Sequence, residues 1–138
     1  GVCTRQQRKV EYFTYGGVTI MADVYKRFIS NLTSSSLTTV FTVPQADVSA
    51  SPPVPVSTFV VKSLSVHNYH ASDAITVTIT HNNGSADFEV DEIDVSASDT
   101  TIKQDVKVFE AGDALKVTAN AANKAMVTVS LLEIQQQQ

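Results

Sequence analysis

Alternation of apolar and polar residues is the feature that most constrains the fold of this chain. It is clearest where Ile75, Val77 and Ile79 alternate with three threonines. Successive side chains of a β-strand point to opposite faces, so this pattern indicates strands with one buried and one exposed face. No segment after residue 35 has sustained helical periodicity. The sequence therefore predicts an all-β protein.

Seven or eight strands are expected, with turn signals at roughly ten-residue spacing. This spacing is typical of a single antiparallel β-sandwich and leaves jelly-roll and immunoglobulin-like Greek-key topologies both open. The expected strands lie at residues 38–43, 58–66, 73–80, 86–90, 100–108, 115–117 and 126–134.

Two hairpins are expected within this pattern. Asn83-Gly84 follows the third strand, and both residues tolerate positive φ, as a tight hairpin requires. The returning strand should then turn Phe88 and Val90 inward. The last two strands flank a small-residue turn at 120–123, which predicts a closing hairpin that leaves the final strand at a sheet edge.

The chain divides into three parts by composition. Residues 1–35 are expected to form an extended basic N-terminal arm, residues 36–134 the β-sandwich domain, and residues 135–138 a polar glutamine tail. At 138 residues the chain is long enough for one domain with a sizeable core. Cys3 is the only cysteine, so neither an intrachain disulfide nor a thiolate metal cage can form.

The charge is unevenly distributed. Residues 1–27 hold five cations against two acids, a balance of +3, whereas residues 28–138 hold five lysines against twelve acids, a balance of −7. A basic arm on an acidic body suits docking on an acidic neighbour, including another copy of the chain, although a solvated tail would have the same charges. The expected partner-binding residues of the arm are Arg5, Arg8, Lys9, Tyr12, Phe13, Tyr15, Lys26 and Arg27.

The aromatic residues of the arm have two interpretations. Beside cations they could contact nucleic acid, or they could anchor the arm in a groove of a neighbouring subunit. We favour the second, because isolated arms gain affinity by burying aromatic anchors. The net charge of −4 also makes the whole protein no obvious nucleic-acid binder.

An acidic stripe is expected on the fourth strand, where Asp87, Glu89 and Asp91 alternate. The simplest interpretation is a solvated strand face. Loose cation binding and docking of a basic arm are the alternatives, and we include these three residues as a candidate partner-binding face.

No catalytic, cofactor-binding or metal-binding residues are predicted. His67 and His70 are three positions apart, a spacing that places them on one face only in a helix, and nothing requires His81 to join them. The chain has no glycine-rich phosphate loop and no Gly-x-Ser-x-Gly motif. An enzyme is therefore not expected.

Several segments of the sequence resemble small virion structural proteins of tailed bacteriophages. They are the segment from Met21 to Pro44, the strand Val61 to Val66, and the segments Ala111 to Ala119 and Val127 to Ile134. The resemblance implies a β-sandwich without catalytic residues, either a capsid decoration (cement) protein or an accessory subunit of the neck, tail or fibre. In such proteins the chain begins near Met21, so residues 1–20 look like an extension.

These observations together predict a non-enzymatic virion protein that binds and stabilises the major capsid shell. The expected partners are the major capsid protein or other virion proteins, and further copies of the chain in a homo-oligomer. A host-receptor or carbohydrate-binding module is the alternative, which would need an exposed aromatic platform from Phe59, Tyr69 and Phe109. The expected location is the virion, at the capsid surface, after assembly in the host cytoplasm. No apolar run approaches the roughly 20 residues needed to cross a membrane, and no signal-peptide segment opens the sequence.

Overall fold

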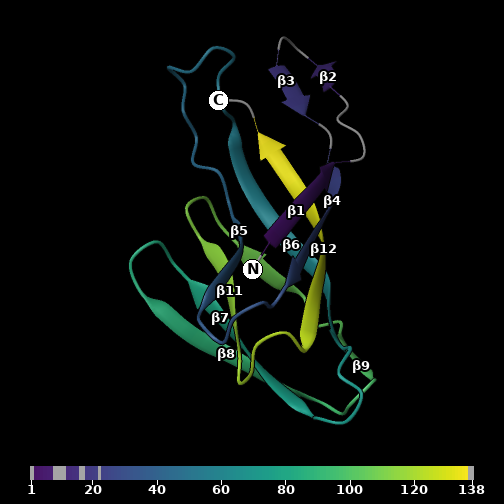
Figure 1. Cartoon of the computed structure of the whole chain (residues 1–138). Coiled ribbons are helices and arrows are strands. Elements are labelled where there is room, and N and C mark those ends of the chain that lie inside the picture. Colours follow the sequence, from purple (N-terminus) through teal and green to yellow (C-terminus); the bar gives the residue numbers. More distant parts are fainter. Residues whose placement is uncertain (1, 8–11, 16–17, 22, 137–138) are drawn as a thin grey trace.

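The fold is a sandwich of two antiparallel sheets, seen in a computed structural model that describes the strands at residues 2–7, 12–15 and 18–21 and all of residues 23–136 (Figure 1). Within these residues all regular secondary structure is β, as predicted, and no helix is long and apolar enough to cross a membrane. The strands are β1 (Val2–Gln7), β2 (Tyr12–Tyr15), β3 (Val18–Met21), β4 (Val24–Asn31), β5 (Thr38–Thr42), β6 (Val56–Asn68), β7 (Ile75–Asn82), β8 (Asp87–Val95), β9 (Thr100–Lys103), β10 (Lys107–Phe109), β11 (Ala114–Ala119) and β12 (Ala125–Gln136).

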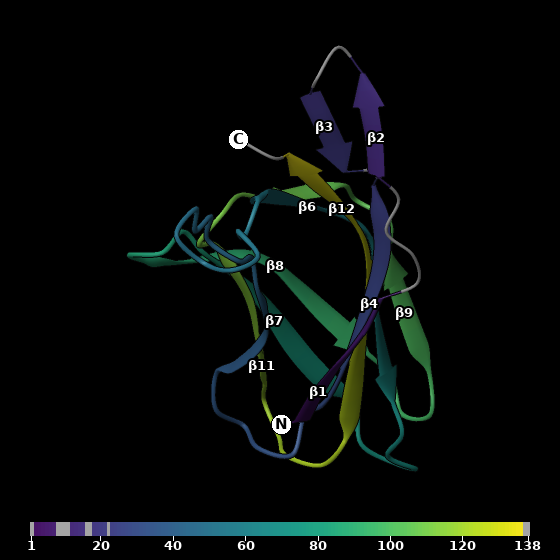
Figure 2. The same cartoon turned by 90° about the horizontal axis from the view of Figure 1, so that it is seen from above.

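The strand order is that of a jelly roll. The six-stranded sheet runs β1-β4-β12-β6-β10, with β9 also paired to β6, and the four-stranded sheet runs β5-β11-β7-β8. If β4 is counted as the first strand, and β9 and β10 are counted together as one, the sandwich has eight strands. One sheet then has the strand order 1-8-3-6 and the other the order 2-7-4-5. This arrangement resolves the choice of topology that the sequence leaves open. Figure 2 shows the two sheets facing each other.

The core forms because inward positions of both sheets carry apolar side chains. Ile75, Val77 and Ile79 of β7 are buried, as their alternation predicts, and they face residues such as Val127 and Val129 of β12 across the sandwich. Four phenylalanines strengthen this core. The Phe41 ring lies 5.2 Å from the rings of Phe28 and Phe59 and 5.1 Å from that of Phe109.

The expected closing hairpin is wrong. β11 pairs with β5 and β7 in one sheet, whereas β12 pairs with β4 and β6 in the other, so residues 120–124 cross between sheets. Backbone bonds fix this crossing: Asn120 N–H donates to Thr76 O at 3.0 Å, and Leu32 N–H donates to Ala125 O at 2.9 Å. β12 is therefore central, and the expectation that the final strand forms a sheet edge is also wrong.

The expected arm contains two strands of the six-stranded sheet, β1 and β4. β4 pairs with β1 on one side and with β12 over eight residues on the other. The arm expectation therefore fails for residues 2–7 and for residues 24–31, which form β4. The sequence conceals this strand because two of its inward positions are polar, Lys26 and Ser30, which interrupts the alternation.

The remaining expected strands are found with altered bounds. Residues 100–108 form two short strands, β9 and β10, rather than one. The hairpin at Asn83-Gly84 is confirmed, but its loop spans residues 83–86 and of these only Gly84 has positive φ.

Candidate interaction surfaces

The edge strand β8 carries all three residues of the predicted acidic face. β8 pairs only with β7, and Val90 has no register partner because a bulge lies between the pairs Ile79–Asp91 and Thr80–Glu89. A bulge changes which face the following side chains occupy. The single stripe expected from Asp87, Glu89 and Asp91 is therefore interrupted.

The three predicted acidic residues lie in different surroundings. Asp87 is exposed, accepts a hydrogen bond of 2.7 Å from Asn82 Nδ2 and lies 3.5 Å from Lys116 Nζ. The Asn82 amide, and to a smaller extent the Lys116 ammonium, lower the pKa of Asp87. Glu89 is exposed. Asp91 is only partly exposed, with Oδ2 3.8 Å from Lys103 Nζ.

The expectation that Phe88 and Val90 face the core is wrong. Phe88 is 53% exposed and Val90 46%. Both lie on the β8 segment between the bulge and the hairpin loop, where the strand extends to the margin of the sandwich. An exposed pair of this size on a free strand edge is a feature that monomeric proteins usually avoid.

A second group of exposed apolar side chains lies along β9 and β10. Ile102, Val106 and Val108 are each more than half exposed. β9 and β10 lie at an edge of the six-stranded sheet, and β8 lies at an edge of the four-stranded sheet. The two edges are adjacent, because Lys103 forms an ion pair with Asp91 and Thr101 Oγ1 donates a hydrogen bond of 3.5 Å to Asp94 O. We call this margin of the sandwich the β8–β10 side. It holds five of the nine exposed large apolar residues found in residues 23–136, which identifies it as the main candidate for an interaction surface.

The predicted arm residues are distributed between the sandwich and the N-terminal strands. Tyr12, Phe13 and Tyr15 fall in β2, which pairs only with β3, and Arg5 falls in β1. Figures 1 and 2 show the β2–β3 hairpin projecting beyond the two sheets. Two further predicted residues, Arg8 and Lys9, lie outside the described residues.

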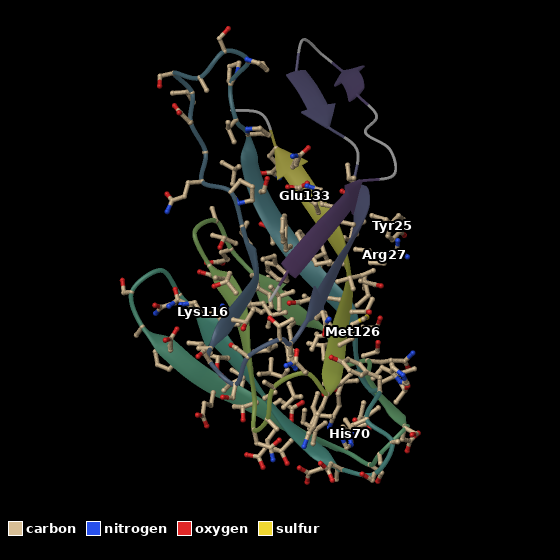
Figure 3. All side chains as sticks on the ribbon, in the orientation of Figure 1. Tyr25, Arg27, His70, Lys116, Met126 and Glu133 are labelled. Atoms are coloured by element: carbon tan, nitrogen blue, oxygen red, sulfur yellow. The ribbon has the colours of Figure 1, made fainter. Side chains whose placement is uncertain are left out.

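The last two predicted arm residues belong to β4 and point in opposite directions. Arg27 is exposed and, like Tyr25, points away from the sandwich in Figure 3. Lys26 is 5% exposed and forms an ion pair with Glu133 of β12, which is 1% exposed. Its Nζ also lies 5.4 Å from the centre of the Phe59 ring. Lys26 is therefore a core residue of the structure and cannot contact a partner directly.

Sequence reasoning missed this buried pair, although a signal for it exists. Lys26 interrupts the apolar positions of β4, and Glu133 takes an inward position that continues the series Val127, Val129 and Leu131 of β12. Opposite charges at two such interruptions are consistent with a cross-strand pair, because a buried charge needs a partner.

The three histidines have separate roles within the fold. His67 Nδ1 lies 2.7 Å from Thr100 Oγ1, and His70 Nδ1 accepts backbone N–H bonds from Ser72 and Asp73. The His81 ring stacks on Phe109 with 4.1 Å between ring centres, and its Nε2 lies 2.9 Å from Asp113 Oδ2. No group of three or more His, Cys, Asp or Glu residues that could hold a metal ion occurs within the part of the chain that the structure describes.

The aromatic platform required by a carbohydrate-binding module does not form from the expected residues. Phe59 and Phe109 are fully buried in the core. Tyr69 is 41% exposed, and its hydroxyl donates a 3.0 Å hydrogen bond to Asn31 Oδ1.

Comparison with known proteins gives structural likeness alone. No family model matches the chain, and no curated protein sequence matches it. Solved structures similar to it include a subunit of Bacillus endospore appendages, described as disulfide-linked pili (9% identity, 99% of this chain and 93% of the other, TM-score 0.45). They also include the CBM22-1 xylan-binding domain of Paenibacillus barcinonensis Xyn10C (15%, 97% and 86%, TM-score 0.40) and a pentameric capsid protein from metagenomic phage sequences (20%, 79% and 58%, TM-score 0.32).

Proposed function

We propose that this chain is a non-catalytic structural protein of a tailed-bacteriophage particle, and that it binds the assembled capsid shell as a decoration protein. Its partner is the major capsid protein, and its location is the outer surface of the virion. The protein stabilises the shell by mass action, because a ligand that binds only the assembled state favours that state over the dissociated one.

The observation that carries this proposal is the row of exposed apolar residues on β9 and β10. Ile102, Val106 and Val108 are 60%, 62% and 53% exposed. Patches of this kind mark contact surfaces with other macromolecules. The row lies on one edge of the six-stranded sheet, where a protein shell could cover it.

Two further features support the proposal. The jelly roll is a fold used by viral capsid proteins, although it also occurs in lectins, so the fold by itself does not select a function. The described histidines make contacts within the fold, and His81, which is paired with Asp113, also stacks on the buried ring of Phe109. Phrases of the sequence that resemble phage virion proteins add to both features.

Binding to shells stripped of accessory proteins tests the proposal. Purified protein is mixed with such shells, and bound protein is measured by co-sedimentation while shell melting is followed by calorimetry. We expect saturable binding and a higher melting temperature of the shell. Absence of saturable binding would refute the decoration role.

The contact surface is tested with matched variants. Ile102→Asp with Val108→Asp should abolish shell binding, because charges then occupy the apolar row. Val48→Asp is the control, since Val48 is 71% exposed but lies in the loop before β6. Equal binding by both variants would place the shell contact elsewhere on the molecule.

A further inference from the structure

The β2–β3 hairpin has the composition of a segment that is covered by a partner. Its eight described residues include six large apolar ones: Tyr12, Phe13, Tyr15, Val18, Ile20 and Met21. Among the strands that the structure describes, these two pair only with each other. β3 lies close to β12, but a two-stranded hairpin is at most marginally stable in water by itself, so this one gains stability if it packs against a further surface.

The edge strand β8 has the matching properties. It is nine residues long, pairs on one side only, and exposes Phe88 and Val90. Free edges of this type accept an additional strand, with apolar side chains giving affinity beside the backbone bonds.

The hairpin strands themselves carry no charged residue, but the sequence that leads into them is opposite in charge to β8. Residues 1–22 contain three cations, Arg5, Arg8 and Lys9, against one acid, Glu11. On β8, the carboxylates of Glu89, Glu92 and Asp94 take part in no ion pair within residues 23–136, whereas Asp87 and Asp91 each lie beside a lysine. Complementary charges weaken binding to other partners and orient the two binding surfaces as they meet.

The hairpin cannot be the partner of β8 within the same molecule in the observed arrangement. In Figures 1 and 2 it projects beyond the six-stranded sheet and away from β8. We propose that the β2–β3 hairpin of one copy docks along the β8 edge of a second copy, covering Phe88 and Val90. This inference rests on the proposed function, because the resulting oligomer is the form of the protein that would decorate the shell.

The resulting interface is head-to-tail, because the donating hairpin and the accepting strand are different surfaces. Interfaces of this type produce rings when the rotation closes.

The experiment measures the mass of the full chain in solution, without shells, by light scattering after size exclusion. We expect an oligomer, and a 14.9 kDa monomer for two variants: Phe88→Asp with Val90→Asp, and Tyr12→Ser with Phe13→Ser and Tyr15→Ser. The control Val48→Asp should remain oligomeric. Unchanged circular dichroism spectra establish that both monomeric variants are folded.

Mixing the two variants gives the sharpest result. One retains an intact hairpin and the other an intact β8, so the mixture should form a dimer and no ring. A monomeric parent protein at about 100 μM, or oligomers that persist in both variants, would overturn the proposal. Shell binding of each monomeric variant is measured in a separate experiment. A protein that does not self-associate can therefore be distinguished from one that does not bind shells.

Discussion

The ammonium group of Lys26 on β4 is paired with the carboxylate of Glu133 on β12, and both side chains are almost completely buried. The two strands are neighbours, with Lys26 opposite Leu131 and Val24 opposite Glu133, so the pair is diagonal across the ladder. No hydrogen bond from another described group reaches the carboxylate. Each charge therefore depends on the other for its stability inside the core.

Replacing one member of this pair should destabilise the fold much more than replacing both. We expect Lys26→Met or Glu133→Gln to lower the free energy of unfolding by about 3–5 kcal/mol, because one buried group loses its partner. The double variant Lys26→Met with Glu133→Leu should lose clearly less. Urea unfolding measures all three, and a double variant as unstable as the sum of the singles would contradict the pairing.

Phe41 should be among the most sensitive core positions. Its ring contacts those of Phe28, Phe59 and Phe109, and it is 3% exposed. Phe41→Ala should lower the free energy of unfolding by about 3–5 kcal/mol, since it leaves a cavity between the sheets. Phe88→Ala is the matched control, and we expect its cost to be below about 1 kcal/mol in the monomer because Phe88 is half exposed.

Two glycines with positive φ offer a graded comparison. Gly112 has φ +88° and Gly84 has φ +93°. A Cβ at Gly112 would lie 2.7 Å from Gln45 Nε2, whereas at Gly84 its nearest neighbour would be Gly112 O at 3.6 Å. Both alanine variants should lose about 1–2 kcal/mol to backbone strain, and Gly112→Ala should lose at least as much as Gly84→Ala. The reverse order in thermal unfolding would show that Gln45 moves aside freely.

The ion pair between Asp73 and Lys124 should make the free energy of unfolding depend on pH in the acidic range. A hydrogen bond from Lys124 Nζ of 2.7 Å, the charge of Lys124 and then the charge of His70 lower the pKa of Asp73 from 3.8. Because the folded state has the lower pKa, this contribution is present above pH 3.8 and is lost as the pH falls below that value. Lys124→Met should therefore be less stable than the parent at pH 7, and the difference should shrink below pH 4. A difference that stays constant from pH 7 to pH 2.5 would contradict this assignment.

Strand positions could be predicted from the sequence where inward residues are apolar, as in β7 and β12. The prediction failed for β4, because Lys26 and Ser30 occupy inward positions. It also failed for Phe88 and Val90, because a bulge and the margin of a sheet are properties of three-dimensional packing that alternation does not encode.

Strand pairing was less predictable than strand position. Alternation states which face of a strand is buried, but β11 and β12 satisfy that requirement equally well in two different sheets. The small residues at 120–123 suit a crossing between sheets as well as a hairpin. The surface of β8 was predicted only in part: Asp87 and Glu89 are exposed as expected, but the exposed residues Phe88 and Val90 were assigned to the core.

The central place of β12 has a consequence for how the protein is made. β4 and β6 both pair with this strand, which follows every other strand in the chain. While the protein is being translated, those two strands have no neighbour between them until residue 136 has left the ribosome. The six-stranded sheet is therefore completed only once β12 has been synthesised, after the other described strands of both sheets.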